Sequence, residues 1–233
     1  MQAEGKVVEL ILVDGVSAAR ISCPPRMIPP PGAYLLAYRP GSDSPLATPV
    51  FAGRFFGEPH IKGPDSFLAA PPAPLAWTPG TRLYLRGPLG HGFVMPASAR
   101  RIALVAFDSS PRRLLALLDA AFEQAAEVTL VCDDLLDDLP LQVEVQPLRA
   151  LAEVCNWADY LALDAARESI PTLKQTLGNV NPLKMACEAQ ILIRTPMPCG
   201  ALAECGVCSV ELRGGVQLAC DDGPVFDLKS LVL

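Results

Sequence analysis

Short apolar segments separated by proline and glycine make up the first part of the chain. The clearest lie at residues 6–13, 32–38 and 81–86, and none repeats its apolar positions at helical spacing. Strand-length runs bounded by turn residues are typical of antiparallel β structure. The pattern predicts an antiparallel barrel or sandwich over residues 1–98.

A different pattern begins near residue 100. Residues 101–107 form an unbroken apolar run of the buried-strand type, and residues 127–132 form a second. Between them, residues 108–111 have the composition of a helix start, and apolar positions follow at helical spacing through Phe122. A strand, a helix and a strand in this order predict a parallel pair. A strand at 157–163 and a helix at 171–177 extend the predicted α/β domain over residues 99–188.

The last 45 residues, 189–233, lose this alternation and carry a group of cysteines. The predicted fold is therefore a multi-domain α+β chain. It combines an antiparallel β domain, a central nucleotide-binding-like α/β domain with a parallel sheet, and a C-terminal cysteine segment.

Composition and charge exclude several classes of protein. Hydrophobic residues make up 51% of the chain and charged residues 19%, so there is ample material for a folded core. The net charge is −6 and basic residues do not cluster, which argues against a nucleic-acid partner. No apolar run approaches the roughly 18 to 20 residues of a membrane helix, and no signal segment is evident. We expect a soluble, cytoplasmic protein.

Four of the eight cysteines lie close together in the sequence. They follow the spacing C-x5-C-x2-C-x11-C at Cys199, Cys205, Cys208 and Cys220. Plant-type 2Fe-2S proteins use C-x4-C-x2-C with a distant fourth cysteine, so the first gap differs by one residue. Gly200 and Gly206 permit the tight curvature that brings backbone N–H groups close to an anionic cluster. We predict that the four thiolates ligate a 2Fe-2S cluster.

Two other uses of these cysteines stay open. Four thiolates also satisfy a structural zinc ion, although zinc ribbons usually offer two C-x2-C pairs and this segment has one. Disulfides are the third alternative, which a reducing compartment disfavours. The remaining cysteines are isolated in mostly apolar surroundings, where we expect inert, buried thiols: Cys23, Cys132, Cys155 and Cys187.

Three motifs occur in a recognisable order along the chain. Residues 87–93 read Gly-Pro-Leu-Gly-His-Gly-Phe, residues 197–200 read Met-Pro-Cys-Gly, and residues 220–226 read Cys-Asp-Asp-Gly-Pro-Val-Phe. Together with the β-rich opening and the β-α-β unit, they resemble the electron-transfer subunit of B-type dihydroorotate dehydrogenases, a ferredoxin-reductase-like family. The resemblance covers nearly the whole chain.

The resemblance implies a β-barrel that holds FAD, an α/β domain that receives NAD and a C-terminal segment with a 2Fe-2S cluster. It implies that electrons pass between a flavin in a partner catalytic subunit, this cluster, FAD and NAD. It also implies that the four late cysteines are the cluster ligands. The partner in the implied hetero-oligomer is a flavin-containing dehydrogenase, which in this family is dihydroorotate dehydrogenase, an enzyme of pyrimidine biosynthesis.

The chain departs from the family pattern at the NAD site. The family has a glycine-rich turn after the first strand of the α/β domain, whereas this chain has Phe107, Asp108, Ser109 and Ser110 before Pro111. A bulky ring and a carboxylate stand where the backbone would approach a pyrophosphate. We therefore expect that NAD does not bind in the usual mode.

The flavin site also departs from the family pattern. By resemblance, the contacts fall at Pro49, Val50, Gly63, Ser66, Gly87 and Gly90. The family's Arg before the proline and Ser after it are absent, and Asp65 replaces a second glycine in the phosphate turn. These residues leave FAD binding open.

The remaining polar candidates have simpler interpretations. His91 could contact a flavin or a partner, and a loop histidine is more often solvated; His60 is expected at the surface. The acidic run Asp133, Asp134, Asp137 and Asp138 predicts a solvated loop. Residues 223–226 have no reactive group and are expected to pack the cysteine segment against a neighbour. No hydrolytic set of residues appears at credible spacing.

The sequence thus supports two functions. The first is an electron-transfer subunit that carries a 2Fe-2S cluster, with little catalysis of its own. The second is a scaffold or regulatory subunit that has lost its nucleotide sites and keeps a zinc ion for structure.

Overall fold

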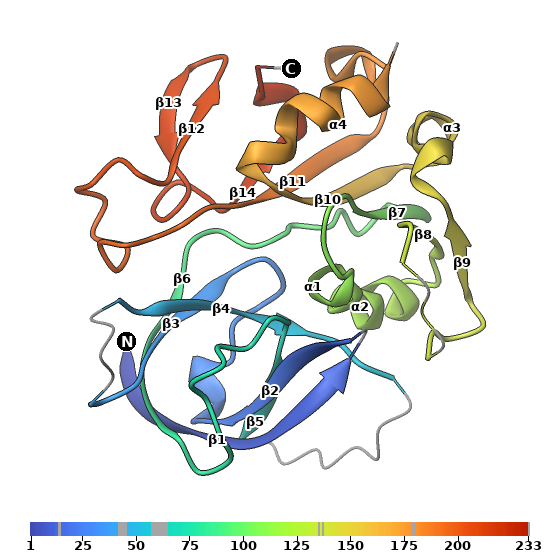
Figure 1. The fold of residues 1–233 in the computed structure, drawn as a ribbon. Coiled ribbons are helices and arrows are strands. Elements are labelled where there is room, and N and C mark those ends of the chain that lie inside the picture. The colour runs from blue at the N-terminus through green and yellow to red at the C-terminus, as the bar shows by residue number, and fades with distance from the viewer. Residues whose placement is uncertain are drawn as a thin grey trace.

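A computed structural model describes residues 1–13, 15–41, 46–56, 65–134, 136, 138–178 and 180–232. The N-terminal strands lie together on one side of the molecule, and the sheet formed by the later strands lies on the other (Figure 1). The C-terminal hairpin lies at the edge of the sheet, on the side where the barrel strand β6 leaves for the second half of the chain (Figure 1).

Six antiparallel strands close on one another in the first half of the chain. Their order is β1-β2-β5-β4-β3-β6. Side chains alternate between the interior and the outside along each strand, and the interior holds an apolar cluster that includes Leu35, Val50 and Leu85. The bounds are β1 Gln2–Val13, β2 Val16–Ser22, β3 Tyr34–Tyr38, β4 Thr48–Gly53, β5 Ser66–Ala69 and β6 Arg82–Leu89. A short 3-10 helix, Pro25–Met27, joins β2 to β3.

The second half is built on a six-stranded sheet of order β14-β11-β10-β7-β8-β9. All neighbours are parallel except β14, which runs antiparallel to β11. Both faces are covered, which explains the nearly continuous apolar runs in the sequence. The bounds are β7 Arg101–Ala106, β8 Glu127–Val131, β9 Val143–Gln146, β10 Tyr160–Ala166, β11 Glu188–Arg194 and β14 Val225–Asp227.

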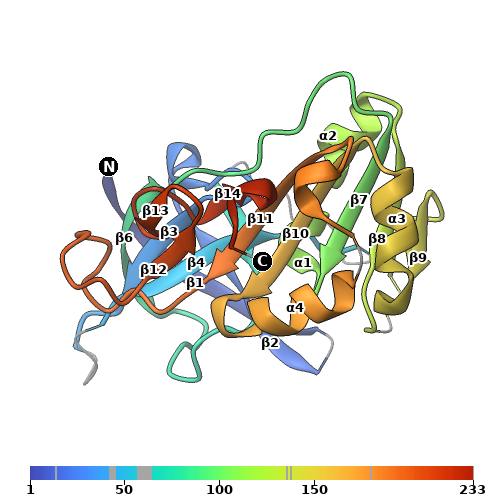
Figure 2. The ribbon, with the colours of Figure 1, turned by 90° about the horizontal axis from the view of Figure 1, so that it is seen from above.

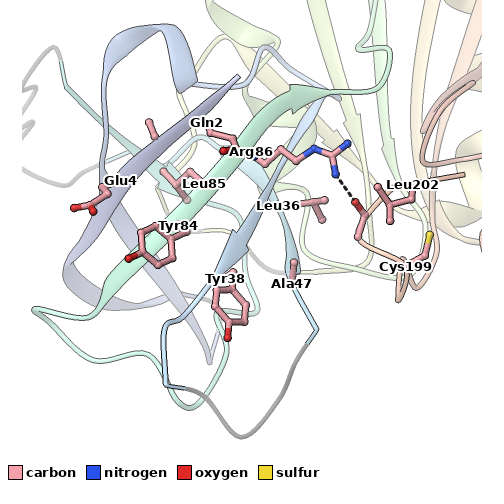
Figure 3. A pocket seen from close by; sticks show the side chains of 12 residues that line it. Gln2, Glu4, Leu36, Tyr38, Ala47, Tyr84, Leu85, Arg86, Cys199 and Leu202 are labelled. Atoms are coloured by element: carbon pink, nitrogen blue, oxygen red, sulfur yellow. Dashed lines mark hydrogen bonds between the residues drawn. The ribbon is translucent and has the colours of Figure 1, made fainter.

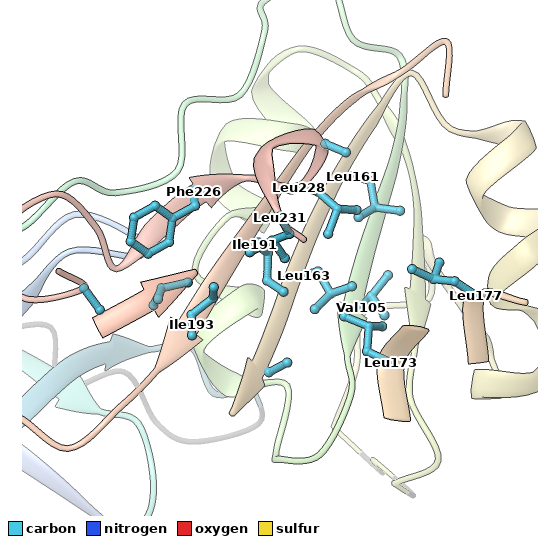
Figure 4. Packing of buried hydrophobic residues seen from close by; sticks show 14 of the residues in the cluster. Val105, Leu161, Leu163, Leu173, Leu177, Ile191, Ile193, Phe226, Leu228 and Leu231 are labelled. Carbon is cyan, nitrogen blue, oxygen red and sulfur yellow. The ribbon is translucent and has the colours of Figure 1, made fainter. Parts of the chain in front are cut away.

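Short helices cover the two faces of the sheet (Figure 2). Helices α1 and α2 pack on the face that contains Ile102 and Leu104. Helices α3 and α4 pack on the opposite face, with Leu173 and Leu177 against Val105 and Leu163 (Figure 4). The bounds are α1 Arg112–Leu115, α2 Leu118–Glu123, α3 Leu151–Trp157 and α4 Ile170–Leu177.

The apolar pattern through Phe122 gives two helices rather than one. In a continuous helix the carbonyl of Arg112 would bond to the next turn, but here it accepts a hydrogen bond from Arg54 N–H of the barrel, at 2.9 Å. Pro111 precedes α1, and no side chain caps this helix. The first turn is therefore tied to the barrel.

Four strands lie from Glu188 onward. Of these, β11 and β14 belong to the main sheet, whereas β12 Ser209–Leu212 and β13 Gly215–Leu218 form a separate hairpin. The C-terminal part also contacts the barrel end. At Gly90, whose φ is 70°, an added Cβ would lie 2.5 Å from the carbonyl oxygen of Gly223, so only glycine fits this close approach.

The mixed α and β architecture with a parallel sheet is thus confirmed. Within the described ranges, no helix has both the length and the apolar character needed to cross a membrane.

Candidate functional site

The four late cysteines lie in the segment between β11 and β12 and just after β13. Cys208 and Cys220 are buried, Cys199 is half-buried and Cys205 is exposed. The thiol of Cys199 lies near that of Cys205 and the thiol of Cys220 near that of Cys208, and each neighbour affects the pKa of its partner. The negative charge of Cys199 also raises the pKa of Cys220. The fold thus gathers the four residues as two neighbouring pairs.

The backbone of this segment turns its N–H groups toward sulfur. Positive φ angles occur at Gly200 (65°), Ala201 (57°), Ala203 (59°) and Gly206 (68°). Such conformations build concave sites that favour anions. The N–H groups of Leu202, Glu204 and Cys205 lie near the sulfur of Cys199 and lower its pKa, and that of Ala203 acts in the same way on Cys220.

These neighbours give the two halves of the segment different acidities. The N–H of Leu202, followed by the thiol of Cys205, lowers the pKa of the Cys199 thiol to about 7. Burial, followed by the neighbouring thiol of Cys208, raises the pKa of the Cys220 thiol to about 12. Cys199 is therefore more readily converted than Cys220 to the thiolate form that binds metals.

The donor set suits a group ligated by thiolates. Four sulfurs and a row of backbone N–H groups are what an anionic iron-sulfur cluster or a tetrahedral zinc ion requires. Among the described residues, however, no three His, Cys, Asp or Glu side chains are close enough together to hold a metal ion. The segment supplies the ligand types of such a group, but in this structure the sulfurs stand in two pairs and do not form a set that would hold it.

A cavity of about 550 Å³ lies beside this segment (Figure 3). Its walls are mainly apolar and come from β1, β3 and β6, with Cys199, Gly200 and Leu202 on the other side. The side chain of Arg86 crosses from β6 and donates to the carbonyl of Gly200 at 3.0 Å (Figure 3). Cys199 therefore lies at the edge of this cavity.

A second candidate site is the crevice at the carboxyl ends of β7, β10 and β11. Open α/β sheets bind ligands here, where the strand order reverses, and in this sheet the reversal lies between β7 and β10. The chain fills the position with its own charges. Asp164, which is completely buried, accepts hydrogen bonds from Arg113 Nε and Arg194 Nε, each at 2.7 Å.

Further bonds extend this network to the barrel and to the loop after β7. Arg113 also donates to the carbonyl of Pro71 at 3.1 Å and to Ser109 Oγ at 2.9 Å. Asp108 pairs with Arg194 and accepts the N–H of Ala166 at 2.9 Å. Burial raises the pKa of Asp164, which Arg113 counteracts, and burial lowers the pKa of Arg194 to about 10.

The crevice does not fit a dinucleotide. A pyrophosphate needs free N–H groups and a positive field, whereas Asp108 places a carboxylate there and the nearby guanidinium groups are already paired. A bound phosphate would have to break this buried network. The expectation that NAD does not bind in the usual mode therefore gains a structural reason.

The predicted flavin contacts are spread over different surroundings. Val50 points into the barrel interior, while Pro49 lies half-buried on β4 opposite Leu36 of β3. Ser66 begins β5 opposite Ser22. Gly87, with φ 142°, packs so closely that an added Cβ would lie 2.8 Å from Leu35. Gly63 lies outside the described residues.

The outer face of β4 is occupied where a flavin ring would be expected. Phe51 packs beside Tyr34, with the ring centroids 5.8 Å apart, and the guanidinium of Arg113 lies 6.0 Å from the centroid of the Phe51 ring. An aromatic ring thus replaces the polar side chain of the family pattern, and the residues present do not fit FAD in the usual mode.

The prediction of a solvated acidic loop needs correction at Asp138, whereas Asp133 and Asp134 are exposed. Asp138 is not solvated: it accepts hydrogen bonds from Arg112 at 2.7 Å and from the N–H of Phe56 at 3.0 Å. Burial opposes ionisation, but these bonds outweigh it and lower the pKa of Asp138. Asp133 accepts the N–H of Leu148 at 2.9 Å. The acidic run is therefore partly structural, because it satisfies backbone and arginine donors; Asp137 lies outside the described residues.

His91 and the isolated cysteines have clear surroundings. His91 is exposed, and its backbone N–H donates to the carbonyl of Gly223 while its ring Nδ1 lies 3.0 Å from the carbonyl of Asp222. It therefore helps to attach the C-terminal segment. The other four cysteines are buried as expected, and burial raises the pKa of Cys155 to about 12. His60 lies outside the described residues.

Sequence reasoning missed the arginines that organise both sites. Arg113 and Arg194 close the crevice, and Arg86 reaches the cysteine segment. One signal was available: Asp164 interrupts an otherwise apolar strand, and a charge in a buried strand requires a partner.

Comparison with known proteins identifies the fold. No protein-family model and no curated protein matches the chain. Among solved structures, an NADH-dependent reduced ferredoxin-NADP oxidoreductase described in work on flavin-based electron bifurcation superposes with a TM-score of 0.73. The two share 15% identity, over 97% of this chain and 88% of that one.

Other structures of similar fold are more distant. A ferredoxin reductase of carbazole 1,9a-dioxygenase has a TM-score of 0.58 at 13% identity, over 76% of this chain and 64% of that one. A ferredoxin NADP+ reductase from Neisseria gonorrhoeae with bound FAD and NADP has a TM-score of 0.54 at 11% identity, over 82% and 98%. At these identities the comparison establishes a ferredoxin-reductase-like fold.

Proposed function

We propose that this chain is an electron-transfer subunit that carries a 2Fe-2S cluster on Cys199, Cys205, Cys208 and Cys220. The observation that carries the proposal is the segment around Cys199. There, backbone N–H groups point at sulfur and a second thiol pair lies next to the first. When bound, the cluster supplies one-electron chemistry.

The chain's own residues would hold and surround the cluster. Hydrogen bonds from backbone N–H groups stabilise negative charge on sulfur. They therefore favour the reduced state of the cluster, relative to a cluster whose thiolates receive no such bonds. The buried pair, Cys208 and Cys220, excludes water on one side, and the exposed Cys205 leaves the other side accessible. The proposed transfer is not routed through NAD(P) or through FAD bound in the usual mode, because the residues present fit neither arrangement.

The proposed partner is a flavin-containing dehydrogenase that forms a hetero-oligomer with this chain. The motifs at residues 87–93, 197–200 and 220–226 resemble those of the dihydroorotate dehydrogenase family, so we propose its catalytic subunit as the partner, in pyrimidine biosynthesis and in the cytoplasm. The similar fold of ferredoxin reductases agrees with a role in electron transfer.

One observation favours a second candidate function. The closed crevice removes the acceptor site that a reductase of this fold would need. A scaffold or regulatory subunit with a structural zinc ion on the same four cysteines would have the same crevice.

Cofactor analysis of an anaerobically purified sample separates the two. The first function predicts two iron and two sulfide per chain. Stoichiometric zinc without sulfide would contradict it and support the scaffold. Stoichiometric flavin would show that the barrel binds FAD in a different mode.

A further inference from the structure

Three neighbouring barrel strands form one wall of the cavity beside the cysteine segment. In β6, Arg86 lies opposite Gln2 of β1 and, on its other side, opposite Leu36 of β3. Two residues earlier in β6, Tyr84 lies opposite Tyr38 of β3. Alternate residues of a strand share one face of a sheet, so these side chains line the outside of the barrel together (Figure 3). The wall therefore combines two phenol rings with a single guanidinium.

The opposite wall comes from the cysteine segment, where Cys199, Gly200 and Leu202 line the cavity. Ala47, which lies just before β4, lines it as well, whereas no residue of β4 itself does. The cavity is thus separate from the outer face of β4, where a flavin ring would be expected. Its volume of about 550 Å³ is typical of small-molecule sites, which span roughly 300–1,000 Å³.

Arg86 brings an unneutralised charge to this cavity. The side chain is half-buried, and within the described part of the chain it forms no ion pair. Its one hydrogen bond there runs from Nη1 to the carbonyl of Gly200 at 3.0 Å, so other N–H groups of the guanidinium keep their capacity to donate. The carboxylate of Glu4, which also lines the cavity, is paired with Arg82 at 3.0 Å. A half-buried cation beside apolar walls favours an anionic ligand.

The walls narrow the chemistry of that ligand. A guanidinium binds a carboxylate through two parallel N–H bonds, and an aromatic ring packs on the phenol rings of Tyr38 and Tyr84. Arg86 and Tyr84 are two residues apart in a strand, about 7 Å, a span that a small bicyclic aromatic acid covers. A phosphate group would bring a second charge, for which the described lining residues offer no second unpaired cation.

We propose that this cavity binds a planar aromatic monocarboxylate, with the carboxylate on Arg86 and the ring against Tyr38 and Tyr84. The proposal rests on the barrel wall and on the charge of Arg86. It requires neither a metal on the cysteines nor a role in electron transfer, so its test is independent of the function proposed above.

Three naphthalene probes of similar size test the charge of the ligand. The probes 2-naphthoate, 2-naphthylmethanol and 2-naphthylmethylammonium carry a negative charge, no charge and a positive charge. Isothermal titration calorimetry of the full chain at neutral pH and low salt should show one 2-naphthoate bound per chain. Its affinity should exceed that of the alcohol about tenfold, as expected for charge-assisted hydrogen bonds, and the ammonium probe should not bind. Equal affinity for acid and alcohol would overturn the anionic class, and no binding of any probe would overturn the site.

Two variants test the position of the site. Arg86→Gln removes the charge but keeps a donor for the carbonyl of Gly200, so affinity for 2-naphthoate should fall about tenfold, to that of the alcohol. Ala47→Trp fills the cavity and should abolish binding of both probes. Arg213→Gln, at an exposed arginine between β12 and β13, changes the net charge equally and should bind like the native chain. An equal loss in Arg213→Gln and Arg86→Gln would indicate general electrostatic attraction and overturn the site.

A surface substitution tests the packing of the ring without risk to the fold. The side chain of Tyr84 is exposed, so Tyr84→Ala should leave the barrel folded, which far-UV circular dichroism checks. Its affinity for 2-naphthoate and for the alcohol should fall by the same factor, because the ring loses a packing surface while Arg86 still discriminates between the probes. Tyr84→Phe should bind both probes like the native chain. Unchanged affinity in Tyr84→Ala would contradict the proposed orientation.

Discussion

The crevice at the carboxyl end of the sheet and the cysteine segment use polar groups in opposite ways. In the crevice, Asp164 and Asp108 are paired with Arg113 and Arg194, so the charges are satisfied within the chain. In the cysteine segment, N–H groups converge on sulfurs that remain in two pairs. The first region is complete as it stands, and the second is the one that we propose a ligand completes.

This difference shows where a fold of this kind keeps its chemistry. A sheet of this type normally binds ligands at the end where the crevice lies. Here the position contributes to stability and to the attachment of the barrel, through the bond from Arg113 to Pro71. In the function that we propose, the cofactor is bound by the C-terminal segment instead.

The largest predicted effect is the loss of the metal group in Cys208→Ser or Cys220→Ser. A hydroxyl does not replace a thiolate as a ligand of iron or zinc, so metal content should fall to nearly zero. Cys187→Ala, which changes a buried cysteine outside the segment, should keep its full metal content. Metal analysis checks both, with far-UV circular dichroism to show that each variant is folded. Retention of metal in both serine variants would place the site elsewhere.

The free energy of unfolding should be more sensitive to substitutions in the crevice than to substitutions in the cysteine segment. Asp164→Asn leaves Arg113 and Arg194 without their shared carboxylate, and breaking a buried ion pair in this way costs about 3–5 kcal/mol. Urea unfolding of both proteins at neutral pH measures the difference. A change below about 1 kcal/mol, the range of an exposed pair, would mean that the network does not hold the crevice closed.

Dinucleotides should leave the melting temperature of the protein unchanged. A ligand present at about 1,000 times its dissociation constant would stabilise the folded state by about 4 kcal/mol and raise the melting temperature by several degrees. We predict no shift with NADH or NADPH at millimolar concentration in a thermal melt. A shift that Asp164→Asn abolishes would show that the crevice opens to bind these cofactors.

A small effect with a defined pH dependence is expected at the opposite end of the same sheet. Asp159 accepts hydrogen bonds from the side chain of Arg101 at 2.6 Å and from the N–H groups of Arg100 and Arg101. The first of these, with Arg101, is the main reason that the pKa of Asp159 is lowered from 3.8 to about 2.

Because the pKa of Asp159 is lower in the folded state, its contribution to stability is complete above pH 3.8 and is lost as the pH falls through about 2. Asp159→Asn should therefore be less stable than the native chain at neutral pH and nearly equal to it at pH 2. Urea unfolding across this range checks the sign. A difference that grows toward low pH would contradict it.

The sequence was sufficient to predict the β-rich first half and the parallel sheet. Continuous apolar runs such as residues 101–107 identify strands buried on both faces. The break between α1 and α2 could not be predicted, because it depends on a bond from Arg54, which is far away in the sequence. Likewise, Asp138 looks like part of a solvated acidic run until Arg112 is placed beside it.

The candidate site shows the same limit. The spacing singled out four cysteines, which the fold brings together as two pairs, and Phe107 and Asp108 in place of glycines led to the expectation that NAD does not bind in the usual mode. The partners of those residues come from distant strands: Arg194 reaches Asp108 from β11, and Arg86 reaches Gly200 from β6. Such contacts follow from tertiary structure, which local patterns do not encode.

Electron paramagnetic resonance of the anaerobically purified protein tests the central claim most directly. After reduction with dithionite, the account predicts the signal of a reduced 2Fe-2S cluster, with about one unpaired spin per chain. The same sample should lose its visible absorption in part on reduction. A colourless protein that contains one zinc ion per chain and gives no signal would contradict the account.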